Sequence, residues 1–274
     1  MSQAPTVTLS HGTTMPRIGL GTSPMGDDAA EQAVVAALEV GYRLIDTAEN
    51  YRNEVGVGRA LKGAPREELF VTSKFNKRWH SVDGARTAFE ASAEKLGLDY
   101  LDLLLIHWPN PGQDQYVEAW RGLIALREAG LVRAIGTSNF KPSHLQRLID
   151  ETGVAPEVNQ IQLSPLWIKQ DNRDFHAKHG IVTEAWSPIG KGGDLLEHPT
   201  VVEIARAHDK TPAQVVLRWE VQQDVVPIPK SSNRQRLAQN LAVFDFELTD
   251  AELADLSALD CTGSSPADSD KSGH

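Results

Sequence analysis

The sequence predicts an α/β protein, a single (β/α)8 TIM barrel with an N-terminal β-hairpin and extra helices. Apolar runs of strand length alternate with amphipathic stretches of helix length along most of the 274 residues, and no compositional linker separates them. Because strands joined by helices pair in parallel, eight such units favour a closed barrel, which commonly has about this length. A doubly wound open sheet is the alternative architecture.

The expected elements follow the chain in order. A hairpin of residues 6–9 and 15–18 should close one end of the barrel. The barrel strands are expected at 19–21, 43–45, 69–73, 101–106, 132–135, 157–161, 181–185 and 224–227. The helices are expected at 28–40, 53–61, 82–96, 116–129, 142–150, 171–178, 199–208, 212–222 and 234–241. The two consecutive helices after Pro199 and Pro212 exceed the regular alternation, and proline suits a helix start because its missing N–H costs nothing there.

Composition limits the classes of function. We expect one barrel domain over residues 1–261 and a mobile tail over 262–274, which is rich in Ser, Asp, Gly and Lys. The 41% apolar and 23% charged content is typical of a soluble globular protein without a membrane span. The sequence shows no export signal, so we expect a cytoplasmic protein. We also expect a monomer. The net charge of −10 disfavours binding to nucleic acid or to anionic membranes. Cys261 is the only cysteine, which excludes an intrachain disulfide and a thiolate metal cluster.

Four polar side chains stand where three successive expected strands end. Asp46 directly follows one strand and Tyr51 lies in the loop after it, while Lys74 and His107 follow the next two strands. The carboxyl ends of parallel barrel strands converge on one face, so these side chains should share a pocket. Taken singly, each also suits a structural role as a turn cap, packed ring, solvated cation or core histidine. Together they suit the delivery of a proton to a carbonyl oxygen while hydride reaches its carbon.

The proton is expected to come from Tyr51. A free tyrosine has a pKa of ~10, too high for efficient donation near neutral pH, and the ammonium of Lys74 should lower it. Asp46 should keep that ammonium protonated, because an unpaired buried charge is costly. His107 should orient the substrate carbonyl or share its hydrogen bond.

The hydride must come from a cofactor, since no side chain supplies it. The dinucleotide fingerprint is absent, because Gly56-Val57-Gly58 falls inside an expected helix rather than after a strand. The later strand ends offer another way to hold a cofactor. The amides of Asn139 and Gln160 suit a carboxamide, and the ring of Trp186 suits a pyridine, although a core aromatic is the alternative for Trp186.

A basic cluster follows the last expected strand of this otherwise acidic chain. Three cations and two small hydroxyl groups lie within the seven residues Lys230-Ser231-Ser232-Asn233-Arg234-Gln235-Arg236. Lys230, Ser231 and Arg236 are expected to hold one phosphate through charge-assisted hydrogen bonds. Arg234 is more typical of a solvated helix start.

Several short motifs occur in a fixed order. They are Ile45-Asp46-Thr47-Ala48, Val71-Thr72-Ser73-Lys74, His107-Trp108-Pro109, Gly136-Thr137-Ser138-Asn139, Val158-Asn159-Gln160, Trp186-Ser187-Pro188, Pro229-Lys230-Ser231 and Asn240. With these motifs in this order, the chain resembles the aldo-keto reductases, and within them the bacterial 2,5-diketo-D-gluconate reductase-like branch. The resemblance extends from about Val7 to Leu259.

The resemblance implies a catalytic tetrad and a cofactor site. The tetrad is Asp46, Tyr51, Lys74 and His107. NADPH or NADP+ would bind in extended form, without a Rossmann domain, at Ser138, Asn139, Gln160, Trp186, Ser187, Lys230, Ser231, Arg236 and Asn240. Lys230 and Arg236 would bind the adenosine 2′-phosphate. The resemblance thus implies reduction of small aldehydes, ketones or dicarbonyls to alcohols.

Departures from the family pattern concern the substrate. Arg52 stands where the family often has Gly, Asn76 where Trp is frequent, and Ser164 where His is usual. Trp108 and Asn76 are the residues expected to line the substrate pocket. The tail after Asp260 does not match the usual carboxyl-terminal loop, so the identity of the substrate stays open.

Three other functions are considered. An NADPH-binding redox sensor with little turnover would have no need of all four tetrad residues. A barrel hydrolase with Glu184 and Asp46 as paired carboxylates would leave the Lys230 cluster without a purpose. Metal-dependent hydrolysis is disfavoured because His176 and His179 lie in an expected helix with no evident third ligand, and we expect no metal.

Overall fold

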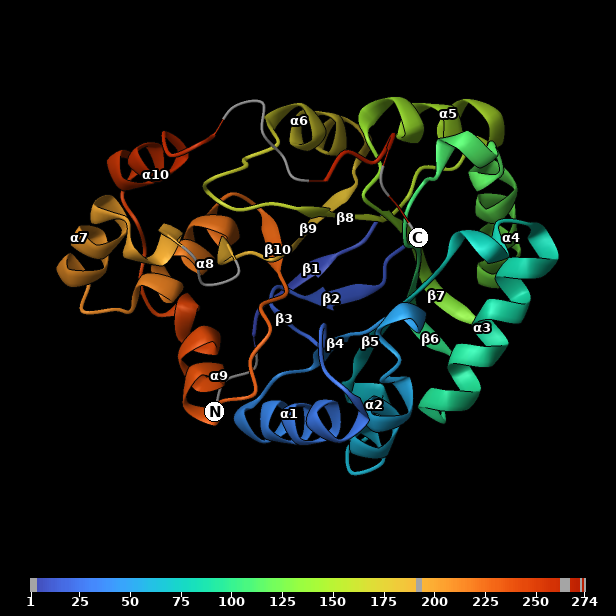
Figure 1. Ribbon diagram of the computed structural model, residues 1–274, viewed down its shortest axis with the longest axis horizontal. Coiled ribbons are helices and arrows are strands. Elements are labelled where there is room, and N and C mark those ends of the chain that lie inside the picture. The colour runs from blue at the N-terminus through green and yellow to red at the C-terminus, as the bar shows by residue number, and fades with distance from the viewer. Residues whose placement is uncertain (1–3, 191–193, 262–266, 272, 274) are drawn as a thin grey trace.

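The computed structural model describes residues 4–190, 194–261, 267–271 and 273, which form one ring of eight parallel strands surrounded by helices (Figure 1). Neighbouring strands pair in chain order. The strands are β3 (Gly19–Gly21), β4 (Leu44–Asp46), β5 (Phe70–Phe75), β6 (Leu101–Ile106), β7 (Val132–Ser138), β8 (Val158–Gln162), β9 (Val182–Trp186) and β10 (Val225–Pro227). The predicted (β/α)8 barrel is confirmed.

The ring is completed between its first and last strands. The backbone N–H of Gly21, at the end of β3, donates to the carbonyl of Pro229 at 3.2 Å, just past β10. A Cβ at position 21 would lie 2.8 Å from the carbonyl oxygen of Ile228. Glycine therefore allows the two backbones to approach closely at the point of closure.

The helices cover the outside of the ring. They are α1 (Asp27–Val40), α2 (Glu54–Leu61), α3 (Val82–Leu96), α4 (Tyr116–Glu128), α5 (Pro142–Thr152), α6 (Gln170–His179), α7 (Pro199–Ala207), α8 (Pro212–Gln222), α9 (Arg234–Leu241) and α10 (Asp250–Ser257). The predicted pair of consecutive helices is confirmed as α7 and α8. The prediction lacked α10, although Thr249 and Glu252 form a reciprocal capping box at its start. None of the described helices is long and apolar enough to cross a membrane.

The amino-terminal hairpin closes one end of the barrel, as predicted. Its strands β1 (Thr6–Thr8) and β2 (Thr14–Pro16) pair antiparallel and lie across the ring in Figure 1. Leu9 and Met15 are buried in the cluster that fills the barrel interior. Each such side chain contributes about 1.5–3 kcal/mol when it is fully buried.

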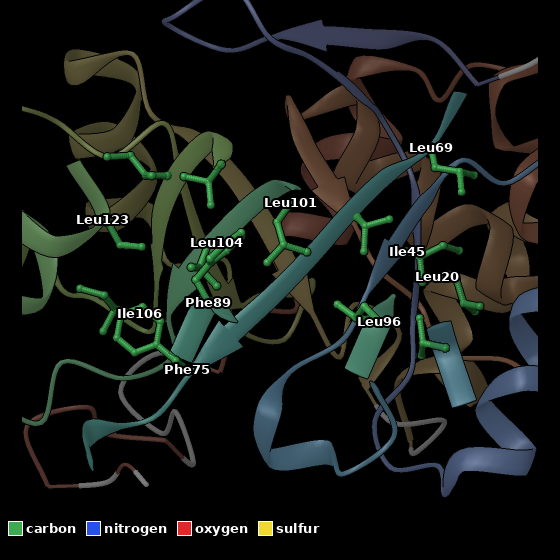
Figure 2. Packing of buried hydrophobic residues seen from close by; sticks show 14 of the residues in the cluster. Leu20, Ile45, Leu69, Phe75, Phe89, Leu96, Leu101, Leu104, Ile106 and Leu123 are labelled. Carbon is green, nitrogen blue, oxygen red and sulfur yellow. The ribbon is translucent and has the colours of Figure 1, made fainter. Parts of the chain in front are cut away.

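The strands divide the core into an inner and an outer layer, because their side chains alternate between two faces. Leu103 and Leu105 belong to the cluster inside the barrel, whereas Leu104 and Ile106 belong to the cluster beneath the helices. Figure 2 shows the outer layer, in which Phe89 of α3 joins the same cluster as Leu104. A side chain two residues farther along a strand therefore returns to the same layer, which determines the position of the polar groups described below.

Part of the carboxyl-terminal segment contacts the start of α5 and the residue before it, Lys141. The ammonium of Lys141 lies 2.6 Å from Oδ1 of Asp268 and 2.5 Å from Oδ2 of Asp270. His144 Nε2 lies 3.0 Å from Oδ1 of Asp270. Residues 262–266, 272 and 274 of the expected tail lie outside the described residues. The boundary at residue 261 and the mobility of the tail stay predictions.

Candidate active site

Polar side chains continue the inner layer at the carboxyl end of the barrel. They follow the inward-facing apolar residues at intervals of two, and are Asp46, Lys74, His107, Ser138, Gln160, Glu184 and Trp186. Five strands extend farther than predicted, by one residue in β4, β8 and β9, and by more in β5, which reaches Phe75, and β7, which reaches Ser138. Lys74 thus lies within a strand rather than after it. The strand geometry holds these side chains on one face.

Lys74 and Asp46 form a buried ion pair. The side chain of Lys74 is 0% exposed and that of Asp46 is 2% exposed. Nζ of Lys74 lies 2.6 and 2.8 Å from the two carboxylate oxygens and donates to the carbonyl of Thr47 at 2.9 Å. The hydroxyl oxygen of Tyr51 lies 3.4 Å from the same nitrogen. The predicted pairing and the predicted proximity of Tyr51 to Lys74 are both confirmed.

Tyr51 is held by a short 3-10 helix, Glu49–Tyr51, that follows β4. The helix ends at Arg52, whose backbone is left-handed with φ 55°. The ring of Tyr51 packs edge-on against the imidazole of His107, with centroids 5.7 Å apart. Both rings line a cavity of about 680 Å³ at the carboxyl end of the barrel, which Asp46 and Trp108 also line.

The pKa of Tyr51 differs from the sequence expectation. Burial raises the pKa of Tyr51, Lys74 opposes that rise, and the charge of Asp46 adds to it, so the pKa lies above 10.0. Lys74 does lower this pKa, as predicted, but the net shift is upward, because the cost of desolvating the phenolate exceeds the attraction of the ammonium. The chain holds Tyr51 as a neutral phenol, which is the form that can donate a proton.

Gln160 connects Asp46 to a second buried carboxyl group. Its Nε2 donates to Oδ2 of Asp46 at 2.8 Å and to Oε2 of Glu184 at 2.6 Å. Glu184 is 0% exposed. Burial, and after it the nearby Asp46 charge, raise the pKa of Glu184 to about 8, while Gln160 and Lys74 act in the opposite direction. Glu184 is therefore a neutral acid at neutral pH.

This raised pKa makes the stability of the fold depend on pH. Between the ordinary value of 4.5 and about 8, folded Glu184 holds a proton that the unfolded chain has lost, so the stabilisation falls as pH rises. Glu184→Gln removes the titrating group. Between about pH 5 and 8, the free energy of unfolding of the variant in urea should rise relative to that of the wild type by up to about 1.4 kcal/mol per pH unit. Parallel stability curves would contradict the raised pKa.

A second cavity of about 470 Å³ adjoins the first. The two share Ile189, Lys230 and Arg236. Lys230 and Arg236 are exposed and form no ion pair with any described residue, whereas Arg234 pairs with Glu39 and lines neither cavity. This agrees with the expectation that Arg234 is solvated at the helix start. Ser231 and Asn240 line the second cavity.

The other residues predicted to bind the cofactor line the first cavity. They are Ser138, Asn139, Gln160, Trp186 and Ser187. Asn139 donates from Nδ2 to the carbonyl of His107 at 3.1 Å and accepts from the indole N–H of Trp186 at 2.9 Å, so its amide fixes both neighbours.

Asn76 does not line either cavity. Its side chain donates to Asn50, next to Tyr51, and its role in substrate binding stays a prediction.

Some lining residues were missed by the sequence reasoning. They are Gly21, Ser23, Pro24, Pro188, Ile189 and Ile228. Ser23 and Pro24 could have been predicted, because the segment after β3 also lies at the carboxyl end of a strand. Among the described residues no group of three or more His, Cys, Asp or Glu side chains is arranged to hold a metal ion. His176 instead bonds Asn159 and Thr183.

The fold and the site define a class of protein: a (β/α)8 barrel with a buried Lys74–Asp46 pair behind Tyr51, whose cavity leads to a second one lined by cations. Residues 11–260 match the model of the Aldo/keto reductase family. The chain belongs to the aldo/keto reductase family, as its motifs predicted.

Relatives of the chain agree with this assignment. An aldo-keto reductase of Mycolicibacterium smegmatis is 48% identical over 259 residues, which cover 94% of each chain. Methylglyoxal reductase DkgA of Yersinia pestis is 48% identical over 265 residues, or 95% of each chain. A crystal structure of a Gox0644 mutant in complex with NADPH is 42% identical, with a TM-score of 0.95 and 100% of both chains covered. These matches confirm the predicted branch of the family.

Proposed function

We propose that this chain reduces small aldehydes, ketones or dicarbonyls to alcohols with NADPH, and that Tyr51 is the general acid. The observation that carries the proposal is the 3.4 Å approach of Nζ of Lys74 to the hydroxyl of Tyr51, beside a cavity that can admit a small carbonyl compound. The names of two similar proteins support it, since one is a methylglyoxal reductase and the other was crystallised with NADPH.

The residues around the two adjoining cavities fit NADPH. The cavities share Lys230 and Arg236, which suit the adenosine 2′-phosphate. Gln160 and Trp186 line the other end, where an amide and an aromatic face suit the nicotinamide. When bound, NADPH supplies the hydride.

The hydrogen bonds of Lys74 explain how Tyr51 could give up its proton. The three N–H groups of Lys74 face four acceptors, which are the two carboxylate oxygens of Asp46, the Thr47 carbonyl and the hydroxyl oxygen of Tyr51. One N–H shared by the two oxygens of Asp46 leaves another for Tyr51. The phenolic proton is then left for the carbonyl oxygen of the substrate. As this proton departs, the ammonium stabilises the phenolate, and Asp46 keeps the ammonium charged. His107, packed against Tyr51, would orient the carbonyl.

The activity test is direct. Protein, NADPH and methylglyoxal should consume the reduced nicotinamide, and a panel of small aldehydes, ketones and diketo sugars should reveal the preferred class. Cofactor binding without turnover on the whole panel would instead favour the redox sensor. The hydrolase alternative is disfavoured because Gln160 lies between the carboxyl groups of Asp46 and Glu184 and bonds both, which leaves no place for a glycosidic bond between them.

The cation cluster allows a matched prediction. Arg236→Ala should weaken NADPH binding by about 10- to 150-fold, the equivalent of one charge-assisted hydrogen bond, and leave NADH binding unchanged. Arg234→Ala is the control, because Arg234 pairs with Glu39 outside both cavities and its loss should not affect either cofactor. Fluorescence titration measures the six dissociation constants, those of NADPH and NADH for the wild type and for each variant. Equal weakening of NADPH and NADH by Arg236→Ala would remove the 2′-phosphate from the proposal.

The monomeric state and the cytoplasmic location expected from the sequence also stay proposals. Size-exclusion chromatography with light scattering would test the first, and cell fractionation the second.

A further inference from the structure

The side-chain amide of Gln160 is fixed by its two carboxyl neighbours. One nitrogen, Nε2, contacts Asp46 at 2.8 Å and Glu184 at 2.6 Å, which uses both of its N–H groups. The reversed amide would direct its carbonyl oxygen at the carboxylate of Asp46, where two acceptors would repel each other. No hydrogen bond from a described residue reaches Oε1 of Gln160, although Gln160 lines the cavity.

We propose that Glu184 is a positioning residue for the cofactor: by binding the second N–H of Gln160, it leaves the carbonyl oxygen of that amide as an acceptor for the N–H of the nicotinamide carboxamide. The inference rests on the proposed function and assigns Glu184 a task outside the tetrad. Without Glu184, one N–H of Gln160 has no acceptor in a buried site, and the amide is free to turn toward another one.

The state of Glu184 suits this task. Its carboxyl group is buried with Oε2 bonded to Gln160, and among the described residues Oε1 has no hydrogen-bond partner. Burial and the Asp46 charge raise the pKa of Glu184 to about 8, so the group is neutral and Oε1 can carry the proton. A neutral acceptor holds the amide without placing a second negative charge beside Asp46 and Tyr51.

The effect can be isolated with a cofactor analogue. In 3-acetylpyridine adenine dinucleotide phosphate, an acetyl group replaces the carboxamide, so the C=O remains but the N–H is lost. Wild-type protein should bind NADP+ about 2- to 12-fold more tightly than this analogue, the range expected for one hydrogen bond. In Glu184→Leu the ratio of the two dissociation constants should fall below about twofold, because Gln160 no longer presents its oxygen reliably.

Three further variants complete the experiment. Glu184→Gln keeps an acceptor for the N–H of Gln160 and should restore the wild-type ratio. Glu184→Met removes the acceptor with a different side-chain shape and keeps the test available should Glu184→Leu not fold. Glu220→Gln is the matched control, since Glu220 is also a fully buried carboxyl but lies on α8 and lines neither cavity. Its ratio should equal that of the wild type.

The outcomes separate a positioning role from a general loss of structure. Equal weakening of NADP+ and the analogue by Glu184→Leu or Glu184→Met, with an unchanged ratio, would overturn the proposal. A wild-type ratio near one would overturn it as well, because Gln160 would then not be the acceptor. Failure of the wild type to bind either dinucleotide would overturn the proposed function itself, and this inference with it.

Discussion

Tyr51→Phe is expected to lower kcat by on the order of 10² to 10⁴ while the dissociation constant of NADPH stays unchanged. The substitution removes only the hydroxyl group that lies 3.4 Å from Nζ of Lys74. Because burial raises the pKa of Tyr51 above 10.0, the wild-type phenol stays protonated near neutral pH. Ionisation of Tyr51 should therefore not lower the rate of reduction in that pH range. Steady-state reduction of methylglyoxal measures kcat, and fluorescence titration measures NADPH binding.

Tyr100→Phe is the control for this experiment. Tyr100 immediately precedes β6, at the end of the barrel opposite the cavity, where its ring lies against the guanidinium groups of Arg66 and Arg133. Loss of its hydroxyl should leave kcat at the wild-type value. A Tyr51→Phe variant that keeps most of its kcat would exclude Tyr51 as the proton donor, whatever the cofactor affinity.

The sequence predicted the strands well where apolar residues define them and poorly where the site begins. The ends of β5 and β7 were placed too early because the apolar signal stops at Lys74 and at Gly136, although the backbone continues as a strand. Polar residues complete these strands inside the barrel. The missing helix α10 has a different cause, since its capping box at Thr249 was present in the sequence but was not used.

The identities of the site residues were more predictable than their energetics. The period of two along each strand was sufficient to bring Asp46 and Lys74 to one face. It was also sufficient to find Glu184, two residues before Trp186, which was considered only as a glycosidase carboxylate. The sign of the Tyr51 pKa shift was not predictable in this way. It depends on whether the burial of the ring, which raises the pKa, outweighs the nearby ammonium of Lys74, which lowers it, and a sequence shows neither the burial nor the distance.

Lys74→Met is expected to abolish activity and to lower the free energy of unfolding by about 3–5 kcal/mol at neutral pH. The methionine fills the space of the lysine stem, but Asp46, 2% exposed, loses its counter-ion and, among the described residues, keeps only Gln160 as a side-chain donor. Protonation relieves the uncompensated charge. In the wild type, burial already raises the pKa of Asp46, and Lys74 opposes that rise. The pKa of Asp46 in the variant should therefore rise further, and the stability deficit should shrink as pH falls. Urea unfolding at about pH 8 and 5.5 measures this recovery.

Two comparisons decide whether the charge itself is responsible. The double variant Lys74→Met with Asp46→Asn removes both charges and should recover most of the stability without recovering activity, because Tyr51 still lacks the ammonium. Lys210→Met breaks a more exposed pair with Asp245 and should cost less than about 1 kcal/mol. An equal deficit for Lys74→Met at both pH values would point to a packing defect. Activity in the double variant would show that proton transfer does not need the ammonium, and the mechanism proposed for Tyr51 would have to be abandoned.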